Sequence, residues 1–252
     1  MPKLGAIDLP APAPTSERNP YSTLPMTSPA RLRIDFVSDV ACPWCAIGLA
    51  SLQEALVRLH GTIEADIHLQ PFELNPQLPF EGEDANAHLM HKYGIGEEQL
   101  DANRAAIRER AAALGFAFNM RKGSRIYNTF DAHRLLHWAE LQGRGHALAL
   151  KQAFLRAYFS DGANVADREI LIRITKDVGL NADEARRVLE SGEYADAVRA
   201  QERYFQQAGI HSVPAIIVEG QYLISGGQPP EIFEHALREI AAKAPTEKPA
   251  LH

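Results

Sequence analysis

Residues 38–45 have the sequence SDVACPWC and contain the only two cysteines of the 252-residue chain. Two thiols separated by two residues, here Cys42 and Cys45, can close a small disulfide ring, supply half of a metal site, or remain reduced as buried apolar side chains. Residues 32–37 alternate apolar and polar side chains as a strand does, and residues 49–59 carry leucines at helical spacing. The pair is therefore predicted at a strand-to-helix junction, which favours the redox interpretation.

The composition describes a globular protein. Apolar residues make up 46% of the chain, enough to fill the core of one large domain or of a small domain with an insertion. The formal net charge of -6 argues against a generic nucleic-acid binder, which normally has a basic surface. A nucleic acid is therefore not expected as a partner. No stretch approaches eighteen apolar residues, so a membrane is not expected as a partner either.

The two ends of the sequence differ from the rest in composition. Residues 1–30 contain seven prolines and no apolar stretch of seven residues, which is unlike a secretory signal and predicts a disordered leader. Met26 is an alternative start. Residues 244–252 contain two more prolines and are expected to form a frayed tail. With no signal sequence recognised, the protein is predicted to be cytoplasmic.

Strand patterns lie near the two ends of the ordered part of the chain, with a long helical stretch between them. A second strand is predicted over residues 63–69, and the pattern from about 83 to 208 is helical almost throughout, with Asn128 expected to cap one of the helices. Residues 215–218 and 222–225 then form a predicted hairpin, followed by an amphipathic helix. This order predicts an α/β fold with a sheet split by a long helical block.

Four segments in this order resemble the FrnE-like branch of the DsbA family. They are residues 38–45 (SDVACPWC), 72–76 (FELNP), 128–135 (NTFDAHRL) and 212–214 (SVP). The resemblance implies an α/β thioredoxin fold with a large helical insertion, thiol–disulfide oxidoreductase activity and a cis peptide bond before Pro214. The implied organisation is a discontinuous thioredoxin-like domain, residues 31–80 and 210–243, around a helical insertion domain, residues 81–209.

The cysteines take different roles in this interpretation. At the start of a helix, unpaired amides and the helix dipole stabilise a thiolate, so Cys42 is the predicted nucleophile. Cys45, one turn further along, is the predicted resolving thiol that attacks the mixed disulfide formed at Cys42. Pro43 removes an amide donor and stiffens the turn, and Trp44 adds a ring without charge. Because no cation stands between the cysteines, we expect a less oxidising disulfide than in secreted relatives.

The predicted site extends beyond the motif. Pro214 is expected to pack against the cysteine pair, and the backbone of Val213 to pair with an extended substrate strand. Pro43, Trp44, Val213 and His133 are the predicted substrate-binding residues, with His133 placed over the active site by the resemblance.

One acidic and several basic residues near the motif have alternative interpretations. Asp39 is interpreted as the cap of a turn, although it could also accept a proton from Cys45. Arg121, Lys122 and Arg125 form a basic cluster that fits a solvated loop better than a site for glutathione carboxylates.

No metal or resident cofactor is predicted beyond the redox-active disulfide of Cys42 and Cys45. His133 and His137 share a helix face but lack the glutamate of an H-E-x-x-H zinc motif. The expected partners are protein or small-molecule thiols and disulfides, and glutathione stays open as a co-substrate. Without a second cysteine pair, recycling needs an external reductant or oxidant. A homodimer is compatible with the sequence.

Two other functions stay open on the same fold. Glutathione-dependent isomerases and kappa-type transferases usually have a serine at the position of Cys42, so the presence of both cysteines argues against them. A chaperone-like binding module that uses the apolar surface around Trp44 is the third alternative.

Overall fold

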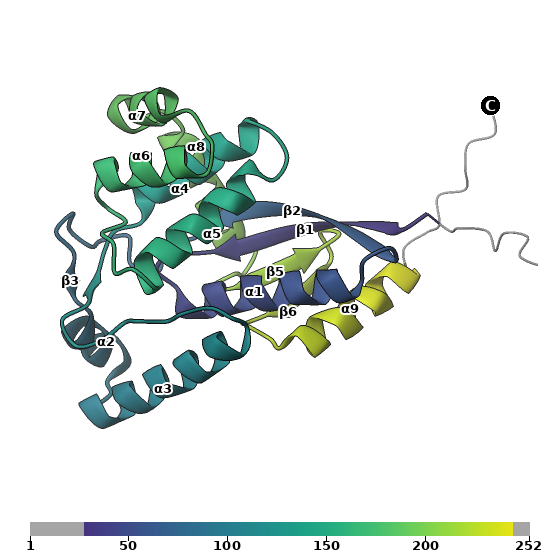
Figure 1. The fold of residues 1–252 in the computed structure, drawn as a ribbon, viewed down its shortest axis with the longest axis horizontal. Helices are drawn as coiled ribbons and strands as arrows, with labels where there is room; N and C mark the ends of the chain where they lie inside the picture. Colours follow the sequence, from purple (N-terminus) through teal and green to yellow (C-terminus); the bar gives the residue numbers. More distant parts are fainter. Residues whose placement is uncertain (1–27, 244–252) are drawn as a thin grey trace, which may run out of the picture.

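A computed structural model of the chain describes residues 28–243 (Figure 1). Its centre is a four-stranded sheet in the order β2-β1-β5-β6. The strands are β1 (Ala30–Ser38), β2 (Ile63–Pro71), β5 (Ala215–Val218) and β6 (Tyr222–Ser225). Ala30 already belongs to β1, so the predicted leader extends one residue too far. The rest of that prediction up to residue 27, and the predicted tail 244–252, lie outside the described residues.

Strand pairing follows the apolar pattern of the sequence. β1 runs parallel to β2, in a register that places Ile34 opposite Ile67. β5 runs antiparallel to β1 and returns through a tight hairpin to β6. Residues 219–221 connect the two strands, and positive φ at Glu219 and Gly220, 55° and 65°, lets the chain reverse there. The predicted hairpin is confirmed.

Two helices from the ends of the described chain cover one face of this sheet. They are α1 (Pro43–Arg58), which connects β1 to β2, and α9 (Pro230–Lys243), and they pack against each other. Ile34 and Phe36 of β1, Leu52 of α1 and Leu237 of α9 are all fully buried in one cluster. Burial of apolar surface between these layers holds the first turn of α1 in place at the end of β1.

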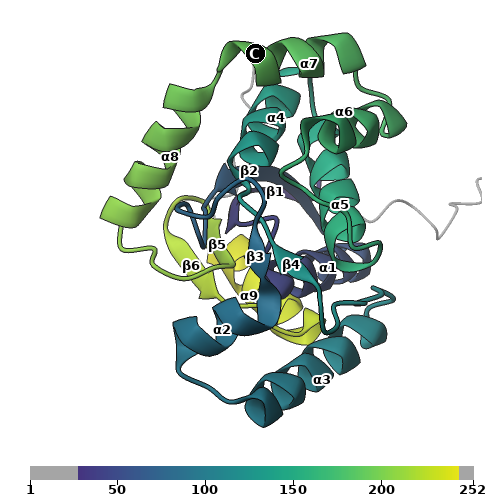
Figure 2. The same ribbon diagram turned by 90° about the vertical axis from the view of Figure 1, so that its left-hand side faces the viewer.

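The long middle segment is helical, with one exception. Its helices are α2 (Ala85–Tyr93), α3 (Glu97–Ala113), α4 (Phe130–Leu141), α5 (His146–Phe159), α6 (Arg168–Asp177), α7 (Ala182–Ser191) and α8 (Ala195–Gln207). The exception is a two-residue ladder between β3 (Glu83–Asp84) and β4 (Arg125–Ile126), too short to give a sequence pattern. Figure 2 shows α2 and α3 below the sheet, α4, α6 and α7 above it and α5 beside it. None of the helices in residues 28–243 is long and apolar enough to cross a lipid bilayer.

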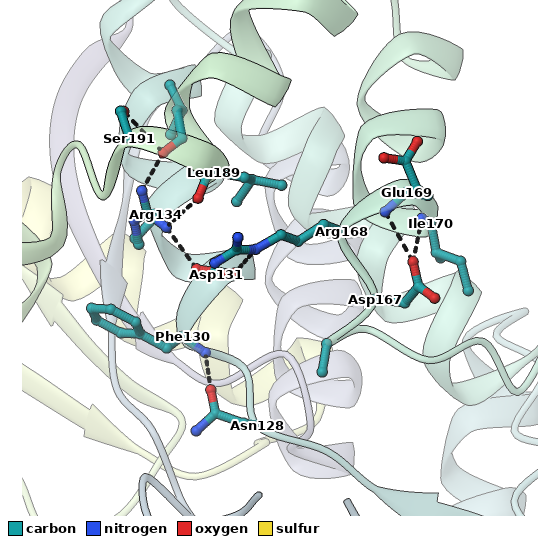
Figure 3. A network of polar contacts seen from close by, with 12 residues as sticks. Asn128, Phe130, Asp131, Arg134, Asp167, Arg168, Glu169, Ile170, Leu189 and Ser191 are labelled. Atoms are coloured by element: carbon teal, nitrogen blue, oxygen red, sulfur yellow. Dashed lines mark hydrogen bonds and ion pairs between the residues drawn. The ribbon is translucent and has the colours of Figure 1, made fainter. Parts of the chain in front are cut away.

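Two helix starts of this segment, at α4 and α6, are visible in Figure 3. At the start of α6 Asp167 accepts hydrogen bonds from the first free amides, and Asn181 does the same at the start of α7. The prediction for Asn128 is wrong, because α4 begins at Phe130 and its N-cap is Thr129. Asn128 instead accepts the Phe130 amide at 2.9 Å, which closes a local turn before the helix.

Candidate active site

Cys42 is the N-cap residue of α1, with Pro43 in the first helical position. The amide of Cys45 donates to the Cys42 sulfur at 3.2 Å, and the Cys42 thiol donates to the carbonyl oxygen of Val213 at 3.6 Å. The two cysteines are not joined by a disulfide in this structure. An amide donor and the positive end of a helix therefore both lie at this sulfur, which is the setting of many nucleophilic cysteines.

Cys45 lies one turn further along α1 and is 0% exposed. Its burial, followed by the contact with Cys42, raises the pKa of the Cys45 thiol well above its ordinary value. Only a thiolate attacks a disulfide, so a resolving role for Cys45 requires its thiol to lose a proton.

The loop before β5 lies against the start of α1. The peptide bond between Val213 and Pro214 is cis, as the resemblance implied. The Pro214 ring touches α1 at Gly48, where an added Cβ atom would come within 3.0 Å of the ring. The Pro214 carbonyl accepts the Gly226 amide at 2.8 Å, which links this loop to the end of β6.

Trp44 is the large apolar side chain beside Cys42 that stays in contact with solvent, at 37% exposed. The guanidinium of Arg110 from α3 lies 5.9 Å from the centre of its ring, within the range of a cation–π contact. The same arginine donates to the Gly227 carbonyl at 3.4 Å. Together with the half-buried Pro43 and Val213, Trp44 forms an apolar border around the Cys42 sulfur.

Asp39 occupies the inner side of the same loop and is fully buried. One carboxylate oxygen accepts the Leu74 amide at 2.7 Å, and the other accepts the Ala41 amide at 3.3 Å and lies 3.4 Å from His133 Nε2. Burial acts to raise the pKa of Asp39, but His133, the Leu74 amide and the charge of Lys151 outweigh it, so this pKa lies below its ordinary value. The Ala41 contact confirms the predicted turn cap.

His133 lies behind the active-site loop, so the prediction that it lies over the site is wrong. Its ring is buried against Asp39 and is not positioned to touch a substrate. His137 contacts Gln201 instead, with its Nδ1 atom 3.3 Å from the amide oxygen. His133 lies on the apolar face of α4, so its ring points into the protein. The resemblance located the segment in the sequence but did not indicate whether the ring is buried.

Lys151 of α5 is only 1% exposed, and the sequence did not lead us to expect it in the site. Burial lowers the pKa of its amine, and the negative charges of Cys45, Asp39 and Cys42, in that order, act against this effect. A signal was present in the sequence, because Lys151 lies on the same apolar face of the helix as Ala147 and Phe154. Lysines are almost never fully buried without a paired charge, so a lysine at such a position is informative.

A second buried group of charged side chains includes Glu73, which follows the end of β2. The carboxylates of Glu73 and Glu202 are both buried and both bind the guanidinium of Arg199. Burial and then the charge of Glu202 raise the pKa of Glu73, in spite of His133 and Arg199. Each glutamate keeps one buried oxygen without a partner among the described residues.

Two members of the predicted basic cluster contact other segments of the insertion. Arg125 donates to the carbonyl oxygens of Glu81 and Gly82, and Lys122 lies 3.2 Å from a carboxylate oxygen of Glu97. Arg121, Lys122 and Arg125 are all exposed, which agrees with the solvated-loop interpretation.

The fold and the cysteine pair at the start of α1 define a thioredoxin-like disulfide oxidoreductase. The chain belongs to the DSBA-like thioredoxin domain family, whose model matches residues 33–238. Its fold is the α/β thioredoxin fold with a helical insertion that the sequence predicted.

Three proteins are similar to this chain in sequence or in fold. A probable DsbA oxidoreductase from Streptomyces coelicolor is 36% identical, with a TM-score of 0.77 and coverage of 88% of this chain and 93% of that one. The cytosolic disulfide reductase DsbM from Pseudomonas aeruginosa, solved with glutathione, has a TM-score of 0.58 at 18% identity, covering 83% of this chain and 99% of that one. The uncharacterized protein YwbO from Bacillus subtilis is 26% identical over 84% of this chain and 98% of its own length.

Proposed function

We propose that this protein exchanges thiols and disulfides through a redox pair in which Cys42 is the nucleophile and Cys45 the resolving thiol. The Cys42 thiolate attacks one sulfur of a substrate disulfide, which forms a mixed disulfide and releases the first substrate thiolate. The Cys45 thiolate then attacks the Cys42 sulfur, which closes the Cys42–Cys45 disulfide and releases the second thiolate. Two electrons pass from the cysteines to the substrate, and the reverse sequence oxidises a dithiol.

One observation carries this proposal. Cys42 caps α1 and accepts the amide of Cys45, whereas Cys45 itself is fully buried behind it. The first sulfur therefore lies at the helix start beside the exposed ring of Trp44, with Cys42 3% exposed, and the second lies deeper, with Cys45 0% exposed. That asymmetry is what a two-step exchange needs.

The remaining parts of the proposal concern substrates. Val213 and Pro214 are proposed to pair with the backbone of an extended substrate, and Trp44 and Pro43 to pack against its side chains. Glutathione is proposed as a co-substrate, supported by the likeness of fold to a reductase that was solved with it. An external reductant or oxidant completes the cycle, in the absence of a further cysteine pair.

Branch, location and assembly belong to the same proposal. The four sequence segments support a place in the FrnE-like branch. A cytoplasmic location is supported by the fold that the chain shares with a cytosolic reductase. A homodimer is compatible with all of these features.

The glutathione-dependent isomerase or transferase reaction is the second candidate on this fold. The presence of a cysteine at position 42, where those enzymes usually have serine, favours exchange over this alternative. A chaperone-like activity would use the exposed ring of Trp44 and does not need either cysteine.

The discriminating experiment compares wild type with Cys42→Ser. Insulin reduction and glutathione conjugation are measured for both proteins. We expect insulin reduction to fall to the uncatalysed rate in the variant, because a serine hydroxyl cannot replace a thiolate in disulfide exchange. Conjugation or binding activity that survives in Cys42→Ser would favour the transferase or chaperone alternative.

A titration against glutathione buffers measures the reduction potential of the Cys42–Cys45 disulfide and so tests the prediction made for it. Trp44 contributes no positive charge between the cysteines, so we expect a potential below the value of about -120 mV for a strong periplasmic oxidant. A potential at that value would contradict the role given to Trp44.

A further inference from the structure

A groove lies between α1, α3 and the start of α9. Its volume is about 750 Å³, which is within the range of ligand-binding clefts. In Figures 1 and 2, α3 runs along the side of α1 that is turned away from α5. The apolar part of its lining comes from Ile47 and Ala50 of α1 and from Ala106, Ala113 and Leu114 of α3. The groove can therefore accept apolar side chains next to the helix that carries the cysteines.

Arg110 of α3 connects this groove with the cysteine motif. It lines the groove, and its guanidinium lies 5.9 Å from the centre of the Trp44 ring. Within residues 28–243 its one hydrogen bond is long, 3.4 Å, to the carbonyl oxygen of Gly227. Trp44 is only two positions from Cys42. A peptide bonded to the Cys42 sulfur therefore comes close to this ring and to the guanidinium in contact with it.

The charges around the groove are unequally paired. Arg58 of α1 forms ion pairs with Glu54 at 3.2 Å and with Glu231 at 2.8 Å, so these three charges offset one another. In the described part of the chain, no carboxylate forms an ion pair with Arg110. Glu109 also lines the groove, but helical geometry turns it about 100° around α3 from Arg110. The charge that adjoins the cysteine motif is therefore positive and available.

A guanidinium in this position is suited to a carboxylate. Its planar fork of N–H donors matches the two oxygens of a carboxylate, which gives direction as well as attraction. The Trp44 ring restrains the guanidinium from one side, so less freedom is lost when Arg110 binds a ligand. A substrate lysine at the same place would be repelled.

We propose that Arg110 selects substrates that carry an acidic residue next to the reacting cysteine, an inference that rests on the exchange reaction at Cys42 proposed above. The substrate carboxylate pairs with the Arg110 guanidinium beside Trp44. Apolar side chains further along the substrate lie in the groove between α1 and α3. The helical insertion thereby contributes to substrate choice, while the thioredoxin-like part carries the cysteines.

The test compares three peptides in which a single cysteine is flanked on both sides by glutamate, by glutamine or by lysine. Each peptide is joined through a disulfide to thiopyridine, an uncharged group whose release is followed by absorbance. The Cys42 thiolate attacks the peptide sulfur, and thiopyridine leaves with the electron pair of the broken bond and takes up a proton. Each rate is divided by the rate of the same peptide with dithiothreitol, which corrects for intrinsic differences in reactivity.

In wild type we expect the glutamate peptide to react about three- to fivefold faster than the glutamine peptide, and the lysine peptide to be slowest. The preference should weaken at high salt, because an ion pair near the surface is screened. Arg110→Gln should react with the glutamate and glutamine peptides about equally, and Arg110→Glu should favour the lysine peptide. The matched control is Arg108→Gln, which removes the same charge from an exposed position of α3 and should keep the wild-type preference.

Three results would overturn this inference. They are equal normalised rates for the three peptides in wild type, an unchanged preference in Arg110→Gln, and an equal loss of preference in Arg108→Gln, which would indicate only the overall charge of α3. Circular dichroism establishes that each variant is folded. If neither Arg110 variant folds, the wild-type salt dependence decides, because a preference that does not weaken with salt counts against an ion pair. Wild type that releases no thiopyridine from any peptide would instead contradict the exchange function itself.

Discussion

The outer region around Cys42 and the inner region around Cys45 are built from different parts of the chain. On the outer side, Pro43, Trp44 and the loop with Val213 belong to segments that also form the sheet and its two helices. On the inner side, the thioredoxin-like segments supply the buried carboxylate of Asp39, and α4 and α5 supply the basic groups His133 and Lys151. The comparison teaches that the outer side is built from neighbouring segments of one domain, whereas the inner side combines charges from both parts of the chain.

The largest expected difference between the two regions is in thiol reactivity. In the folded, reduced protein we expect an alkylating reagent to modify Cys42 at least about a hundredfold faster than Cys45, because Cys42 caps the helix start beside the exposed Trp44 and Cys45 is fully buried behind it. Peptide mass spectrometry after timed quenching measures both rates. In denaturant the two rates should become equal, and equal rates in the folded state would break the comparison.

Stability in acid tests the inner region through Asp39. Its folded-state pKa is lowered, so its contacts stabilise the fold above the unfolded-state pKa of about 3.9 and are lost as the pH falls through the folded-state pKa. We expect Asp39→Asn to lower the free energy of unfolding at neutral pH by about 1–3 kcal/mol, measured in urea. The difference from wild type should narrow in acid. Asp161→Asn, an exposed position, is the control, and a pH-independent difference would contradict the role given to the Asp39 charge.

Lys151→Met should affect stability in the opposite direction. A buried amine with a lowered pKa costs stability wherever it is charged, so the apolar variant is expected to gain about 1 kcal/mol at neutral pH. The gain should shrink as the pH rises toward the ordinary lysine pKa of about 10.4, where the amine is neutral in both states. Urea unfolding at several pH values measures it, with Lys176→Met as the unchanged control. A loss of stability in Lys151→Met would show that the amine has a structural role.

The smallest expected effect concerns the rigid outer region. A Cβ atom at Gly227 would lie 2.8 Å from the backbone oxygen of Trp44, so Gly227→Ala must displace the loop or the helix start. We expect a loss of about 1 kcal/mol and a slower attack by Cys42. Gly96→Ala is the control, because nothing lies within 4 Å of the added atom there. An unaffected Gly227→Ala would mean that the helix start adjusts freely.

The outer region was predictable from the sequence because it is local. The cysteine motif, the strand before it and the helix after it are consecutive, and Val213 and Pro214 were located by the resemblance. The inner region depends on tertiary contacts: His133 and Asp39 are 94 positions apart, and no sequence pattern indicated that they meet. The ring of His133 was therefore placed on the wrong side of the loop, and Lys151 was missed. Asn128 was predicted to be a helix cap because asparagine is favoured both at caps and in turns. In the structure it forms a turn one residue before the cap.

The position of Lys151 on α5 bears on how this protein can be engineered. A minimal scaffold made by joining the two thioredoxin-like segments directly would keep the strand, the cysteines and the loop before β5. It would also lose the buried amine and the histidine, because both belong to the removed helices. Asp39 would then lack the two basic side chains that lower its pKa, so acid would disturb the loop that carries the cysteines at a higher pH than in the whole chain.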